Sequence, residues 1–245
     1  MGTLLHVPVI HESPDLGVVA SLVDRRGAEL AGRERWERHK RTVAGFWDAM
    51  EGFFRALDPH GMKIFQDSLA ADGSLARLIL EEGAARGSRN HRIVLDLLDR
   101  GAVAVKTEDI GMLKEEYERA LKLAGDASPG TGVLAMIAWP PKPDDLLKRR
   151  DRHIARIVEE NLGREGRGIL FIGAFHDVLA ELSSEVAVLR VKDRDMMLAY
   201  QKTLMGQGPG DVHEELGRYL AEPVFPGLDG LPARQGANLA QEGQP

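Results

Sequence analysis

The sequence contains no cysteine among its 245 residues. Disulfide bonds and thiolate catalysis are therefore excluded, and any bound metal ion must take nitrogen and oxygen ligands. The chain also lacks a basic excess, since 32 Lys and Arg stand against 38 Asp and Glu. The resulting formal charge of -6 produces no field that would hold a polyanion, so we expect no nucleic-acid partner.

A long hydrophobic run is absent as well. The apolar stretch from Leu4 to Ile10 is much too short to span a bilayer, and no basic leader precedes it. We therefore expect no membrane association and a cytoplasmic location. Hydrophobic residues make up 43% of the chain, which is enough to bury a substantial core and favours one main domain over two small ones.

Five short apolar runs are typical of β-strands. They are Thr3–Ile10, Met62–Gln66, Ala102–Val105, Gly168–Ile172 and Glu185–Val191. Between them, apolar residues at three- and four-residue steps predict helices at Arg33–Leu57, Ser74–Ala85, Arg89–Asp99, Ile110–Ala124, Asp144–Leu162 and Asp193–Leu204. This alternation predicts an α/β fold with a mostly parallel central sheet of about five strands and helices on both faces.

Composition divides the chain into two parts. Residues 1–205 carry all the predicted strands and helices and form a single α/β domain. Residues 206–245 are a Gly/Pro-rich C-terminal extension, and from residue 227 onward too few apolar side chains are present to offset the entropy lost on ordering. We expect this extension to be partly flexible. The prolines within Ser128–Pro143 predict a loop or lid over the site, although Val133–Trp139 could form an edge strand.

Titratable side chains follow four of the predicted strands. The first strand ends at His11 and Glu12, the second at Asp67, the third at Glu108 and the fourth at His176. Because ligands of open α/β sheets lie beyond the carboxyl ends of the strands, we expect these side chains to converge. Two imidazoles and two carboxylates, His11, Asp67, Glu108 and His176, can ligate Mn, Fe, Co or Zn, or they can act as base and acid around a water molecule.

Helix capping is the alternative role for the polar residues after the strands, because a carboxylate or hydroxyl at a helix start accepts backbone N–H bonds. We assign capping to Ser13, Asp15, Asp109 and Asp177, and both roles stay open for Glu12, Asp67 and Glu108. His11 and His176 have no comparable backbone reason to follow a strand, which makes them the centre of the predicted site.

The remaining histidines are given structural positions. His6 lies inside the first strand and is expected in the core or at a sheet edge. The other five are expected at the surface, namely His39, His60, His91, His153 and His213. The basic run at residues 148–152 is interpreted as a solvated helix face, unless Arg150 reaches the site as an anion clamp or as the counter-charge of a carboxylate.

One part of the sequence carries a family resemblance. Two neighbouring segments together resemble the signature of the TraB/Tiki group. They are Arg150-Asp151-Arg152-His153-Ile154-Ala155 and, further along the chain, Gly168-Ile169-Leu170-Phe171-Ile172-Gly173-Ala174-Phe175-His176. In that group an Arg-Asp or Arg-Asn pair opens a helix, and the next strand ends in Gly-Ala-Gly-His. Here Phe175 replaces the second glycine. The wider superfamily, with erythromycin esterases and ChaN-like haem-binding proteins, carries an early Gly-x-x-His element, which corresponds to Val7-Pro8-Val9-Ile10-His11 without its glycine.

The resemblance implies a hydrolytic site of histidines and carboxylates, metal-dependent in the Tiki proteases and metal-independent in the esterases. His11 and His176 would be ligands or the water-activating base, Glu12 a base or ligand, and Arg150 a positioning charge. We therefore expect a hydrolase that cleaves an ester or amide bond of a small-molecule or peptide substrate, with or without a divalent metal ion. One alternative is a protein that binds haem or a small ligand without turnover. The other is a scaffold that forms a homo-oligomer through the long helix at Arg33–Leu57.

Overall fold

The computed structural model describes residues 1–15, 20–126, 145–204, 206 and 210–224. Within them, five strands form one sheet in the order β3-β2-β4-β1-β5, and every neighbouring pair is parallel. The strands are β1 (Gly2–Val9), β2 (Lys63–Gln66), β3 (Val103–Val105), β4 (Arg167–Gly173) and β5 (Val186–Arg190). The predicted α/β class and the parallel sheet of about five strands are confirmed.

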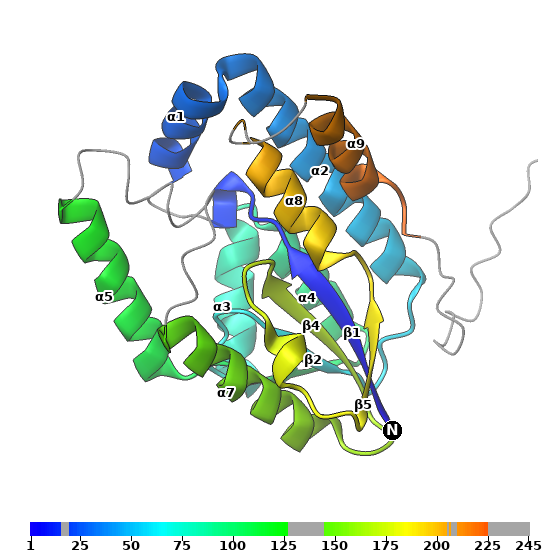
Figure 1. The fold of residues 1–245 in the computed structure, drawn as a ribbon. Helices are drawn as coiled ribbons and strands as arrows, with labels where there is room; N and C mark the ends of the chain where they lie inside the picture. Colours follow the sequence, from blue (N-terminus) through cyan, green and yellow to red (C-terminus); the bar gives the residue numbers. More distant parts are fainter. Residues whose placement is uncertain (16–19, 127–144, 205, 207–209, 225–245) are drawn as a thin grey trace, which may run out of the picture.

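Helices cover both faces of this sheet. The helices are α1 (Ala20–Ala31), α2 (Arg33–Ala56), α3 (Gly73–Ala85), α4 (Arg89–Asp99), α5 (Ile110–Asp126), α7 (Asp145–Leu162), the 3-10 helix η2 (Val178–Glu181), α8 (Arg194–Leu204) and α9 (Gly210–Ala221). Helices α2, α8 and α9 lie on one side and α7 lies on the other (Figure 1). None of the helices in the described part of the chain is long and apolar enough to cross a membrane.

Strand periodicity distributes the buried side chains between the two faces. Leu5 and Val7 of β1 belong to the larger core, which they share with Trp47 of α2. Leu4 points to the opposite face and joins the smaller core with Val158 of α7. Because successive side chains of a strand point to opposite faces, a strand buried on both faces is mostly apolar, as β1 is apart from Thr3 and His6.

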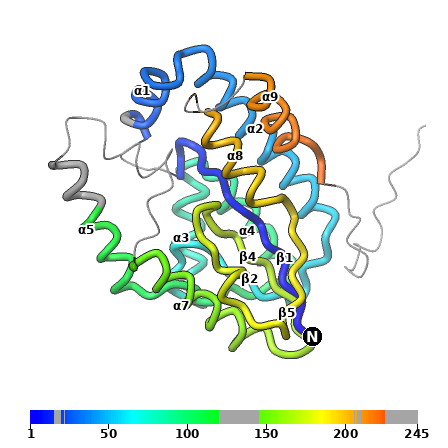
Figure 2. The backbone as a smooth tube through the Cα atoms, viewed as in Figure 1, coloured from blue at the N-terminus to red at the C-terminus, as the bar shows by residue number. Residues whose placement is uncertain are grey.

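The paths of the chain after β1 and β4 create the place for a site. These two strands are neighbours in the sheet. The segment after β1 lies on the side of the larger core, where α2 packs, and Figure 2 shows the end of β1 beside α2 and α8. After β4 the chain enters η2, which packs against α7 on the opposite side. Two loops that leave neighbouring strand ends toward opposite faces produce the crevice in which open α/β sheets bind ligands.

Helix α9 was not predicted, although it packs against α2 and α8. Its side chains Leu216 and Leu220 are buried in the larger core. Part of the expected C-terminal extension therefore belongs to the packed structure. The apolar positions of α9 are few and are surrounded by Gly- and Pro-rich sequence, which concealed their helical spacing.

Three predicted segments lie outside the described residues. They are the lid at Ser128–Pro143, its edge strand at Val133–Trp139 and the stretch from residue 227.

The prediction that His213 lies at the surface is wrong. Its relative exposure is 4%. The His213 ring stacks on Tyr200 of α8 with 4.7 Å between ring centroids, and its Nδ1 lies 2.9 Å from Thr203 Oγ1. His39 of α2 reaches the same group from the other side, since its Nδ1 lies 3.0 Å from the Tyr200 hydroxyl. The packing of α9, which the sequence pattern did not indicate, is the reason for this burial.

Replacing Leu220 by Ala tests whether α9 is part of the core. The free energy of unfolding should fall by about 2–5 kcal/mol, because a buried leucine is removed and a cavity is left behind. Val212→Ala on the same helix is the matched control, since Val212 is 39% exposed and the change should stay within about 0.5 kcal/mol. Urea unfolding followed by tryptophan fluorescence measures both variants, and equally small effects would contradict the packing of α9.

Candidate functional site

Asp67 lies at the centre of the titratable side chains. It follows β2, and its backbone N–H donates to Phe171 O at 2.8 Å, which extends the pairing of β2 with β4. Asp67 Oδ2 accepts a hydrogen bond from the Gly173 N–H at 3.1 Å, and Oδ1 accepts one from Arg150 Nη2 at 3.0 Å. Burial raises the pKa of Asp67, but the charges of His176 and Arg150 lower it by more, so this pKa lies well below its ordinary value.

His176 is held by a carboxylate of α7. Its Nδ1 lies 2.6 Å from Asp151 Oδ1, while Asp151 Oδ2 accepts a hydrogen bond from the Asp177 N–H at 3.0 Å. A carboxylate at Nδ1 keeps the proton on that nitrogen, so Nε2 is the basic nitrogen of the neutral ring. His176 Nε2 lies 3.9 Å from Asp67 Oδ2. Burial lowers the pKa of His176, but Asp151 and Asp67 raise it by more, to above its ordinary value.

His11 approaches the same point from the end of β1. A Cβ atom added at Gly173 would lie 3.2 Å from Asp67 Oδ2 and 3.7 Å from His176 Cδ2. His11 Nε2 would lie 4.0 Å from that Cβ atom. Three side chains thus surround Gly173, and the absence of a side chain at this position lets them approach its backbone closely. Because its side chain is 46% exposed, His11 is the most accessible member of this group.

The charges around His11 also change its pKa. Its Nδ1 lies 3.8 Å from Asp15 Oδ2. Desolvation lowers the pKa of His11, but the nearby carboxylate of Asp15, together with the charge of Asp67, raises it by more. The result is a pKa above the ordinary value of 6.5. Both histidines of the group therefore retain a proton to higher pH than free histidine does.

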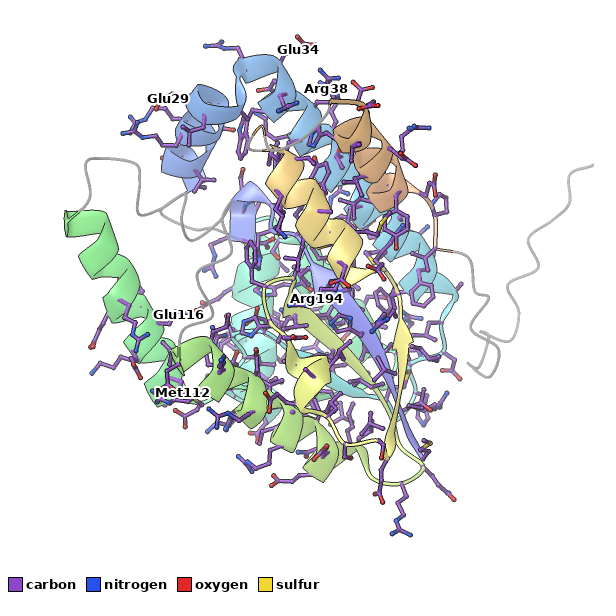
Figure 3. The ribbon with its side chains drawn as sticks, viewed as in Figure 1. Glu29, Glu34, Arg38, Met112, Glu116 and Arg194 are labelled. Atoms are coloured by element: carbon purple, nitrogen blue, oxygen red, sulfur yellow. The ribbon has the colours of Figure 1, made fainter. Side chains whose placement is uncertain are left out.

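Arg150 of α7 provides the positive charge beneath the group. Its relative exposure is 2%, and it forms a buried ion pair with Glu108, which is completely buried. The same guanidinium bonds to Asp67 and lies 2.7 Å from Glu116 Oε1. Figure 3 shows Glu116 on α5, close to the start of α7. Of the two roles considered for Arg150, the structure shows the counter-charge of a carboxylate.

This pairing decides whether the predicted ligands fit a metal ion. The hypothesis requires His11, Asp67, Glu108 and His176, but Arg150 already joins the carboxylates of Asp67 and Glu108. Among the residues that the structure describes, no group of three or more His, Asp or Glu side chains is arranged to hold a metal ion. The four predicted ligands therefore do not fit a metal centre in this arrangement.

Glu12 belongs to the neighbouring surface rather than to the Asp67 group. Its carboxylate lies 3.8 Å from Arg89 Nε of α4, and its backbone N–H donates to Asp15 Oδ2 at 2.9 Å. Burial raises the pKa of Glu12, and Arg89 partly opposes that shift. Glu12 is thus placed at the edge of the site, on the side of α2 and α4.

The capping prediction holds for Asp109, whose Oδ1 accepts a hydrogen bond from the Met112 N–H at 3.0 Å at the start of α5. Asp177 precedes η2, but its side chain makes no cap bond there and instead lies 3.4 Å from Arg194 Nη1. Asp15 accepts a backbone bond as expected and also contacts His11.

Asp151 belongs to the candidate site through its contact with His176, although the sequence pattern predicts no role for it. The helical spacing could have indicated its burial, because Asp151 lies four residues before Ala155 and therefore on the buried face of α7. A carboxylate on the apolar face of an amphipathic helix needs a partner, and here that partner is His176.

Comparisons with models of protein families, with curated proteins and with solved structures gave no match. The fold and the site define an α/β protein with a His/Asp/Arg group at the carboxyl ends of β1, β2 and β4. The resemblance to the TraB/Tiki group stays a prediction from the sequence.

Replacing Arg150 by Met should lower the free energy of unfolding by about 3–5 kcal/mol, because Asp67 and Glu108 lose their buried counter-charge. Arg149→Met is the matched control, since Arg149 is exposed on the same helix and its ion pairs are worth at most about 1 kcal/mol. Urea unfolding measures both losses. Equal losses would contradict the structural role of Arg150.

The same variant has a predictable pH dependence. Burial raises the pKa of Glu108 above 4.5, and removing Arg150 raises it further. A carboxyl with a raised pKa in the folded state contributes stability below its unfolded pKa and loses it as pH rises through the folded pKa. The loss caused by Arg150→Met should therefore be smaller at pH 5 than at pH 8, and Glu108→Gln in the same chain should reduce the loss at pH 8.

Proposed function

We propose that the protein is a hydrolase that cleaves an ester or amide bond, with His176 as the base that activates water. The pairing of His176 with Asp151 carries this proposal. A carboxylate bound to one imidazole nitrogen orients the ring and leaves the other nitrogen free to accept a proton. That free nitrogen, Nε2, lies near Asp67, beyond the carboxyl ends of the neighbouring strands β1 and β4.

His176 would accept the proton of a water molecule as the water oxygen attacks the carbonyl carbon. The imidazolium formed in this step lies between two carboxylates, since Asp151 holds Nδ1 and Asp67 lies 3.9 Å from Nε2. Both carboxylates stabilise the positive charge. Asp67 is too firmly held by Gly173 and Arg150 to act as the nucleophile itself, so we assign it an electrostatic role.

His11 would supply the acid. Its pKa is raised above the ordinary value, so the ring keeps its proton to higher pH, and its exposed side chain can reach a bound substrate. A protonated His11 can stabilise the developing oxyanion or donate a proton to the leaving group. A substrate carbonyl placed beside Gly173 would lie near both histidines.

The contacts of Arg150 favour the metal-independent form of this hypothesis. Arg150 supplies to Asp67 and Glu108 the positive charge that a divalent ion would otherwise bring. Binding of haem or another small ligand without turnover is the alternative expected from the sequence.

Hydrolysis of p-nitrophenyl esters and p-nitroanilides tests this function. Replacing His176 by Ala should lower kcat by roughly 100-fold or more, because the general base is lost. His11→Ala should also lower kcat. His60→Ala is the control for non-specific imidazole catalysis, since His60 is exposed in the turn before β2 and should leave the rate unchanged. Activity that survived in both His176→Ala and His11→Ala, with folding verified by circular dichroism, would refute the proposal.

The pH dependence of kcat/KM gives a second test. His176 must be neutral to act as a base, so activity should fall at low pH with an apparent pKa above 6.5. Asp151→Asn removes the hydrogen bond that raises this pKa, so the acidic limb should move to lower pH while kcat falls. Glu159→Gln, also on α7, is the control. An acidic limb that Asp151→Asn leaves unchanged would contradict the role of the pair.

A further inference from the structure

A cavity of about 360 Å³ lies beside the His11 side of the site. The loop after β1, helices α1 and α2, and the start of α4 form its walls. His11 and Glu12 line it, so the cavity shares two side chains with the predicted site. Two larger cavities lie elsewhere. The one of about 470 Å³ is formed by α2 and α4, the one of about 520 Å³ lies beside the amino end of β5, and neither is lined by His11 or His176.

The apolar wall of this cavity is built around Trp36. Trp36 is 6% exposed, and its Nε1 donates to Asp24 Oδ1 at 2.7 Å, which fixes the indole ring. A Cβ atom added at Gly27 of α1 would lie 2.4 Å from three atoms of that ring, so α1 packs directly on the indole. Val23 and Val43 extend the apolar surface. A rigid aromatic wall of this kind is suited to an aromatic ring.

The cations that line the cavity are already paired. Lys40 Nζ lies 2.7 Å from Glu37 Oε1. Arg89 Nη1 lies 2.6 Å from Asp48 Oδ1, and its Nε faces Glu12. A charged ligand group would have to compete with these partly exposed carboxylates, although each such pair contributes only weakly, whereas a neutral group would not.

His39 gives the cavity a neutral polar group. Its Nδ1 is bound to the Tyr200 hydroxyl, and its ring lies 4.8 Å from the Trp36 ring. Desolvation, followed by the charges of His213 and Lys40, lowers the pKa of His39 to about 4, so the ring is neutral at pH 7. A neutral imidazole beside an indole adds hydrogen-bonding capacity without charge.

We propose that this cavity binds the acyl group of the substrate and that this group is neutral and aromatic. The inference rests on the proposed hydrolase function, and it identifies the substrate class as arylacyl esters or amides. The aromatic ring would pack on Trp36 while the acyl carbon lies beside His11. Water adds its oxygen to that carbon, the acyl C–O or C–N bond breaks, and the proton passes through a histidine to the leaving group.

Hydrolysis rates with two acyl groups test the proposal. Wild-type protein should cleave p-nitrophenyl phenylacetate with kcat/KM roughly tenfold or more above p-nitrophenyl acetate. Ser13→Phe places a large side chain at the edge of the cavity and should abolish this preference. Trp36→Leu should reduce the preference as well. Ser74→Phe, on the exposed surface of α3, is the matched control and should leave it intact.

Binding to an inactive variant separates this inference from the proposed function. Calorimetry with His176→Ala should show that phenylacetamide binds several-fold more tightly than phenylacetate or phenethylammonium, because the lining cations are paired. If phenylacetamide binds and Ser13→Phe removes this binding, but the wild-type protein has no esterase activity, the cavity assignment is supported and the hydrolase function is refuted. The opposite result would overturn only the cavity assignment. In that case the wild-type protein has esterase activity that depends on His176, but it shows no arylacyl preference and phenylacetamide does not bind.

Discussion

The buried ion pairs of Arg150 are the interaction on which the site depends. One guanidinium joins α7 to the end of β2 through Asp67 and to the segment after β3 through Glu108. A buried carboxylate without a counter-charge is strongly destabilising, so the position of Arg150 fixes where Asp67 and Glu108 can lie. With Oδ1 of Asp67 held in this way, Oδ2 accepts the hydrogen bond from the Gly173 N–H. The negative charge of Asp67 also raises the pKa values of His11 and His176.

Helix α7 serves the site with two successive residues. Arg150 and Asp151 lie on the buried face of the helix, which begins at Leu146 and continues through Ile154 and Val158 in the smaller core. Arg150 reaches toward β2, whereas Asp151 reaches His176 after β4. Apolar packing of α7 on the sheet thus positions the counter-charge and the orienting carboxylate together, and rigid placement of this kind is what general base catalysis requires.

The crevice and the cavity follow from the different paths of β1 and β4. His11 leaves β1 toward α1 and α2, which brings it to the cavity beside Trp36, while His176 leaves β4 toward α7. The two histidines therefore meet at Gly173 but have different surroundings. His176 is buried between carboxylates, and His11 is exposed at the boundary between the polar group and an apolar wall. This difference is the basis for assigning proton acceptance to one and substrate contact to the other.

The sequence by itself determined the α/β class, the five strands and the convergence of His11, Asp67 and His176, because hydrophobic periodicity and the position of strand ends are local properties. Only the tertiary structure decided which charges pair. Arg150 and Asp67 are 83 residues apart, and Glu108 is 42 residues from the same arginine. Sequence spacing cannot show that the arginine joins both carboxylates and leaves the predicted metal ligands unsuited to a metal ion. The burial of His213 by α9 and the cavity beside Trp36 likewise depend on helix packing, which brings together residues that no local pattern connects.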